Sequence, residues 1–163
     1  MISVLFAPKT AIICTLILYL KYVVTCLIHA KKREAAGLRA PEDTPDQKQN
    51  FGLVVDNLEE QTKAALVEEK RWARIVGNDL ENIPFGLIIV WASILCGGKS
   101  GINGICIIVF TVARLAHTIF FVWAWSKARS VAYLVGAIAI IVMICAGIAG
   151  VFKDTGLEDI NIV

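Results

Sequence analysis

The chain has 163 residues, of which 57% are hydrophobic, and its formal net charge at pH 7 is only +2. Its mean hydropathy is +0.69. Soluble domains are about 45–50% apolar, so this composition excludes an ordinary soluble enzyme and indicates an integral membrane protein. No basic face interleaved with aromatic residues is present, so the sequence does not predict nucleic-acid binding.

Four apolar segments account for most of the chain. We expect membrane spans at about 8–29, 75–96, 102–125 and 130–152, a loop at 30–74 and an acidic C-terminal tail at 153–163. Too little sequence remains for a separate soluble domain, so a single four-span domain is predicted. Short connections make consecutive helices antiparallel. The expected fold class is therefore all-α, an antiparallel four-helix transmembrane bundle.

The first span is predicted to be a retained anchor rather than a cleaved signal. It lacks a basic region ahead of its apolar run and ends in His29-Ala-Lys-Lys-Arg33 instead of a small-residue cleavage site. Lysine and arginine are concentrated between spans one and two, and again between spans three and four. The positive-inside rule therefore places both termini outside and the first loop in the cytoplasm.

The second span is unusual because its apolar part is too short. As a helix, 84–96 would cover about 20 Å, against a hydrocarbon core of roughly 30 Å. The membrane-spanning helix is therefore expected to begin near Ile75, with 57–69 already helical ahead of it. That start brings four polar residues toward or into the membrane, namely Asn78, Asp79, Glu81 and Asn82. Ionisable groups at that depth are costly and indicate a functional site.

Helical spacing places the polar residues of this second helix on one face about 100° wide. The members of this polar stripe are Arg71, Arg74, Asn78, Glu81 and Asn82. Asp79 points elsewhere and is expected to cap or to pair with a loop. Contact between such a stripe and lipid would be prohibitive, so it is predicted to face protein or a water-filled cavity.

The third span carries Arg114 near its middle and His117 one turn later. A buried arginine needs a partner, and the sequence favours a buried Glu81–Arg114 ion pair. We interpret this pair as structural, a clip that sets the register of two helices, with a functional role as the alternative. His117 has no second histidine or cysteine at ligand spacing, so no metal is assigned.

Several polar residues are expected at one depth near the cytoplasmic face. They are Arg71, Arg74 and Asn78 of the second helix, Arg129, Ser130 and Tyr133 at the start of the fourth, and Arg33 at the end of the first. Guanidinium groups bind carboxylates in bidentate fashion, so the set suits an anionic ligand with carboxylates. The alternative is a juxtamembrane basic belt that contacts anionic lipid head groups.

Three motifs carry a resemblance to a known family. They are Arg74-x-x-x-Asn78-Asp-x-Glu81-Asn before an apolar span, Ala113-Arg114-x-x-His117-Thr in the third span, and Arg129-Ser130-x-x-Tyr133 at the start of the fourth. Together they resemble the membrane-associated eicosanoid and glutathione metabolism (MAPEG) family, and its branch of microsomal glutathione S-transferases and prostaglandin E synthases most of all. The resemblance covers about residues 10–150.

The resemblance implies a homotrimer that binds glutathione as co-substrate between neighbouring subunits, without a metal. The implied glutathione-binding residues are Arg33 (from the adjacent subunit), Arg71, Arg74, Asn78, Glu81, His117 and Tyr133. Arg129, with Ser130, would stabilise the thiolate, since a nearby cation lowers the pKa of a thiol from its usual value of about 8.5. The thiolate would attack an apolar, lipid-borne electrophile.

The expected function is accordingly a membrane-bound glutathione transferase, with peroxidase activity toward lipid hydroperoxides as an extension. Its expected location is the endoplasmic reticulum (the microsomal fraction) or the outer mitochondrial membrane. Two departures from the family keep alternatives open, namely Phe121 where a tyrosine is common and Gly77 where the synthases have an arginine. One alternative is a catalytically silent relative that is a structural subunit of a larger membrane complex. A prostaglandin endoperoxide isomerase is less favoured because of Gly77.

Overall fold

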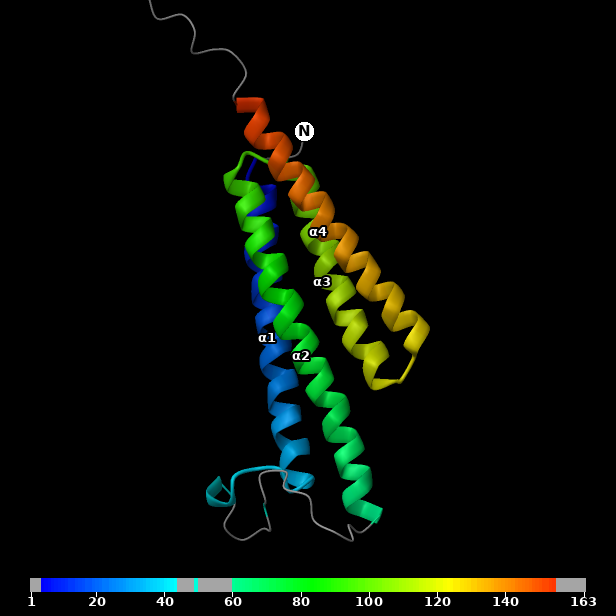
Figure 1. Cartoon of the computed structure of the whole chain (residues 1–163). Coiled ribbons are helices and arrows are strands. Elements are labelled where there is room, and N and C mark those ends of the chain that lie inside the picture. Colours follow the sequence, from blue (N-terminus) through cyan, green and yellow to red (C-terminus); the bar gives the residue numbers. More distant parts are fainter. Residues whose placement is uncertain (1–3, 44–48, 50–59, 155–163) are drawn as a thin grey trace, which may run out of the picture. The chain divides into compact units, whose positions relative to one another are not determined.

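The computed structural model describes residues 4–43, 49 and 60–154, and Figure 1 shows that its regular structure is helical. The elements are α1 (Phe6–Ala35), the 3-10 helix η1 (Pro41–Asp43), α2 (Glu60–Leu95), α3 (Ser100–Val122) and α4 (Ser126–Asp154). No strand occurs in these ranges, so the predicted all-α class is confirmed. The acidic tail beyond Asp154 lies outside the described residues.

Three of the four long helices, α1, α3 and α4, are long and apolar enough to cross a membrane. This agrees with an integral membrane protein. The helix α2 is not among them, although it is 36 residues long. Its apolar part is confined to its C-terminal third, because Asn78, Asp79 and Glu81 lie directly before it. The short apolar stretch predicted for the second span is thus the C-terminal part of one continuous helix.

The described chain forms two compact units. The first comprises Met1–Tyr19 and Glu81–Val163, and the second comprises Leu20–Leu80. In the first unit, the beginning of α1 and the end of α2 share a core with α3 and α4. Its most completely buried large side chains include Leu18, Val90, Ile107, Phe110 and Met143. Helices that meet in lipid gain stability from close van der Waals packing rather than from exclusion of water.

Glycine allows α4 to approach the end of α2 closely within the first unit. A Cβ atom added at Gly150 would lie 2.2 Å from the carbonyl oxygen of Cys96, and one added at Gly147 would lie 3.0 Å from Cα of Ser93. The small residues of α4 therefore bring two backbones together, as small residues do at contacts between membrane helices.

The second unit is a hairpin formed by the C-terminal half of α1 and the N-terminal half of α2. Three ion pairs cross it: Lys21–Asp79, His29–Glu69 (3.0 Å) and Lys32–Glu68 (3.6 Å). Residue numbers rise along α1 as they fall along α2, which is the order expected for antiparallel helices. The Lys21 and Asp79 side chains are buried, and the other two pairs are partly exposed.

Gly150→Ala should destabilise the protein, because its methyl group would meet backbone that cannot rotate away. Overpacking of this kind costs about 1–3 kcal/mol. Gly77→Ala is the matched control, since nothing lies within 4 Å of its Cβ position. Alanine there should stabilise the helix by up to about 1 kcal/mol. Melting temperatures in one detergent test both, and equal shifts of the same sign would contradict the packing account.

Candidate functional site

The polar stripe of α2 lies on the outer side of the helix in the single chain. Arg74 and Glu81 are exposed, and Arg71, Asn78 and Asn82 are half-buried. The buried face of α2 is instead formed by Trp72, Ile75, Asp79 and Ile83, which recur at helical spacing. Within one chain, Arg74 and Glu81 are therefore left exposed, whereas the other three members of the stripe are partly covered.

The expected ion pair between Glu81 and Arg114 stays a prediction. Arg114 is buried at 2% exposure, whereas Glu81 is exposed. Asp79 is an acidic residue that α2 buries, and it forms an ion pair with Lys21 of α1. Helical phase separates the two carboxylates of α2, because Asp79 lies on its buried face and Glu81 lies on the stripe.

Sequence reasoning missed the role of Lys21, although the signal was present. A lysine inside an apolar span requires a counter-charge, just as Arg114 does. In place of the expected cap or loop contact, Asp79 meets Lys21, which its direction away from the stripe allows. A basic residue in one apolar span and an acidic residue off the polar face of another helix were the two halves of one buried pair.

In the first unit, three residues of the family motifs lie together with Phe121, the residue that stands where a tyrosine is common. The three are His117, Arg129 and Tyr133. The guanidinium carbon of Arg129 is 4.3 Å from the centre of the Phe121 ring. The His117 ring meets Phe121 edge-on at 5.9 Å and lies 6.5 Å from the Tyr133 ring. His117 is buried, Phe121 and Arg129 are half-buried, and Tyr133 is exposed. The cluster thus runs from a buried imidazole to an exposed phenol.

The turn between α3 and α4 sets this geometry. Ala124 has a left-handed backbone with φ 58°, and the Trp125 ring stacks on Phe120 at 6.0 Å. The Trp125 amide also donates to the Phe120 carbonyl at 2.9 Å. Because α4 begins at Ser126, Arg129 already lies in its first turn, on the side of Phe121.

Arg129 has no acidic partner in the described part of the chain; its recorded side-chain contact is the Phe121 ring. The aromatic face attracts the cation and leaves the N–H groups at the edge of the guanidinium for a ligand. The neighbouring Ser130 is exposed, and its hydroxyl donates to the Ser126 carbonyl at 3.0 Å. Arg129 is therefore the better placed of the two to meet an anion.

Apart from Glu81, which belongs to the first unit, the other predicted glutathione-binding residues belong to the second unit and are described within it. Arg33 is exposed near the end of α1 and donates to the Leu38 carbonyl at 3.2 Å. On α2, Arg71 pairs with Glu68 at 3.6 Å, an exposed contact of the kind that contributes at most about 1 kcal/mol. Exposed Arg74 and half-buried Asn78 follow on the same face.

Fold and site together define an all-helical membrane protein that presents an arginine on an aromatic ring at the start of its last helix. A family model described as the MAPEG family matches residues 11–149, and the chain belongs to that family. The resemblance inferred from the motifs is thereby confirmed. A search of curated proteins found no match to this chain.

Removing the Lys21 charge should be strongly destabilising, because the buried Asp79 carboxylate would lose the counter-charge of Lys21. Loss of one partner of a buried ion pair costs about 3–5 kcal/mol. We expect Lys21→Met to lower the melting temperature far more than Glu81→Gln, which changes an exposed carboxylate. Adding Asp79→Leu to Lys21→Met should recover part of the loss. If Glu81→Gln proved as costly as Lys21→Met, the assignment of the buried pair would be overturned.

Proposed function

We propose that this chain is a membrane-bound glutathione transferase. The observation that carries the proposal is Arg129, a half-buried cation held on the Phe121 ring and without an acidic partner among the described residues. A cation beside a thiol favours its deprotonated form, which is the reactive nucleophile. Membership of the MAPEG family, which includes glutathione transferases and related enzymes, supports the same reading.

The proposed site lies between subunits of a homotrimer. The exposed Arg74 and Glu81 of the α2 stripe support this arrangement, because charged groups near a membrane need protein or water around them. A neighbouring subunit that covers the stripe would supply Arg33 to glutathione beside Arg71, Arg74, Asn78 and Glu81. His117 and Tyr133 complete the proposed binding residues. We further propose that the first loop lies in the cytoplasm and that the protein resides in the endoplasmic reticulum or the outer mitochondrial membrane.

The proposed reaction is displacement on an apolar electrophile. The glutathione thiolate attacks an electrophilic carbon, a sulfur–carbon bond forms, and the leaving group departs with its electron pair, as chloride does from a chlorinated aromatic. Arg129 stabilises the thiolate before attack. An apolar groove of about 560 Å³ between α3 and α4 supports an apolar second substrate, since Ala128 and Phe120, the neighbours of Arg129 and Phe121, are among its lining residues.

Titration calorimetry of the detergent-solubilised protein with glutathione tests the proposal, and we expect binding below millimolar ligand. Conjugation to a chlorinated aromatic should fall on the order of a hundredfold in Arg129→Ala, by analogy with removing one preorganised stabiliser of developing charge. Lys127→Ala, which removes an exposed cation two residues away, should retain activity. No heat at millimolar glutathione would instead favour the catalytically silent structural subunit, for which Gly77 remains the motivating residue.

Phe121 should be a positioning residue for Arg129. Phe121→Leu keeps an apolar side chain but removes the ring, and cation–π contacts contribute about 0.5–2 kcal/mol. We expect roughly 2- to 30-fold less thiolate at a fixed pH, measured by its ultraviolet absorbance in the glutathione complex. Phe121→Tyr keeps the ring and should retain the thiolate. Identical behaviour of the leucine and tyrosine variants would show that the ring does not position Arg129.

A further inference from the structure

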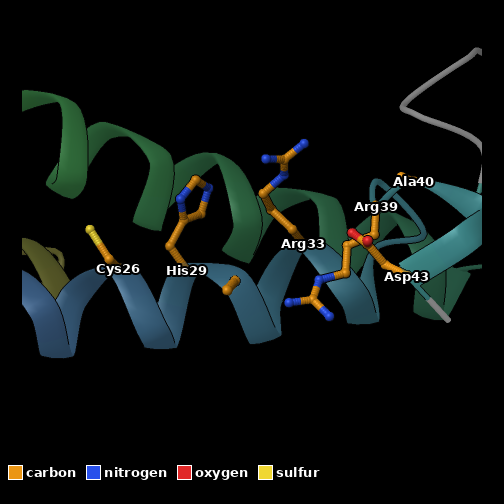
Figure 2. A pocket seen from close by; sticks show the side chains of 7 residues that line it. Cys26, His29, Arg33, Arg39, Ala40 and Asp43 are labelled. Carbon is orange, nitrogen blue, oxygen red and sulfur yellow. The ribbon is translucent and has the colours of Figure 1, made fainter.

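A polar cavity of about 420 Å³ lies beside the C-terminal half of α1 (Figure 2). Its lining residues, all in the second unit, are Cys26, His29, Ala30 and Arg33 of α1, Arg39 and Ala40 of the following loop, and Asp43 of η1. Figure 2 shows the Cys26, His29 and Arg33 side chains on the same side of α1. The cavity therefore has one helical wall and one wall formed by the loop and η1.

The charges of this cavity are only partly used within the described chain. Arg33 donates one hydrogen bond to a backbone carbonyl and has no acidic partner there. Arg39 reaches Glu34 at 3.4 Å, a long contact at the surface. Asp43 is exposed and forms no ion pair with a described residue. His29, in contrast, is engaged by Glu69. The Arg33 guanidinium and the Asp43 carboxylate, which have no ion-pair partner among the described residues, thus remain for a ligand.

A wall with both signs of charge fits a ligand that carries an acidic group and an ammonium group close together. Guanidinium binds phosphate or carboxylate through paired hydrogen bonds, and a carboxylate accepts hydrogen bonds from a primary ammonium. Two sources share this chemistry: a phospholipid head group with a primary amine, and a free amino-acid-like ligand such as glutathione.

The position of the cavity favours the lipid. The helix α1 is a candidate membrane span, and the cavity lies toward its C-terminal end, where phospholipid head groups are expected. A lipid head group is therefore the source of this chemistry that the position of the cavity favours.

We propose that this cavity binds phosphatidylethanolamine, with the phosphate at Arg33 and the ammonium at Asp43. The inference goes beyond the proposed transferase activity and shares only Arg33 with it. Because Arg33 is also a proposed glutathione residue, lipid and glutathione should compete. The lipid would then occupy the cavity in the absence of glutathione and lower the apparent affinity for it.

The test is native mass spectrometry of the purified full chain after exposure to equal amounts of phosphatidylethanolamine, phosphatidylcholine and phosphatidylglycerol. The trimethylated amine of phosphatidylcholine has no N–H to donate to Asp43. We expect phosphatidylethanolamine to be retained roughly tenfold over the other two, as one charge-assisted hydrogen bond allows. Asp43→Asn should reduce this preference to about one, and Arg33→Gln should weaken retention of all three lipids.

Two matched controls sit next to these residues in sequence but do not line the cavity. Glu42→Gln makes the same charge change as Asp43→Asn at the preceding residue, and Lys31→Gln removes an exposed cation of α1 near Arg33. Both should keep the preference for phosphatidylethanolamine. Equal retention of the three lipids by the unaltered protein, or equal losses in the control variants, would overturn the proposal. Melting temperatures establish that each variant is folded.

Calorimetry with glutathione distinguishes the two sources. If Asp43→Asn weakens glutathione binding and leaves lipid retention unchanged, the cavity belongs to a soluble ligand and the lipid proposal fails. If the unaltered protein binds no glutathione but still selects phosphatidylethanolamine, the transferase proposal fails while this inference stands. Displacement of bound phosphatidylethanolamine by added glutathione would support both.

Discussion

The buried pairing of Lys21 with Asp79 is the interaction on which the α1–α2 hairpin depends. Neither charge is tolerable alone in an apolar environment, so each helix is held at the register that brings the two together. The outer pairs, His29–Glu69 and Lys32–Glu68, follow from that register and are partly exposed. The buried pair fixes the hairpin, and the exposed pairs add little free energy of their own.

This register also decides which side of α2 is available for function. With Asp79 turned toward α1, the stripe that contains Arg74, Asn78 and Glu81 faces outward. The buried carboxylate of Asp79 stabilises the hairpin, and the exposed carboxylate of Glu81 is free of that structural role. The structural charge and the candidate ligand-binding charges are thus separated by helical phase on a single element.

The candidate reactive cation, Arg129, is held by a different kind of interaction. Arg129 lies on an aromatic ring rather than beside a carboxylate, so its positive charge is not cancelled by a neighbour in the described chain. Phe121 stands where the family often has a tyrosine, so a hydroxyl is missing there. Its ring nevertheless supplies the surface on which the Arg129 guanidinium lies. A tyrosine would provide the same face, so the substitution changes the hydrogen bonding available at the site and preserves the ring.

The sequence by itself determined the helical class, three of the four expected apolar spans, the short apolar part of α2 and the stripe along it, because each follows from local composition and helical period. It also carried the motifs that led to the family. Only the tertiary structure decided which buried charges meet. The Lys21–Asp79 pair and the contact of Arg129 with Phe121 depend on the phase and register of two elements at once. The 3.6-residue repeat of one helix fixes which of its own side chains share a face, but it does not specify where the side chains of a neighbouring helix lie.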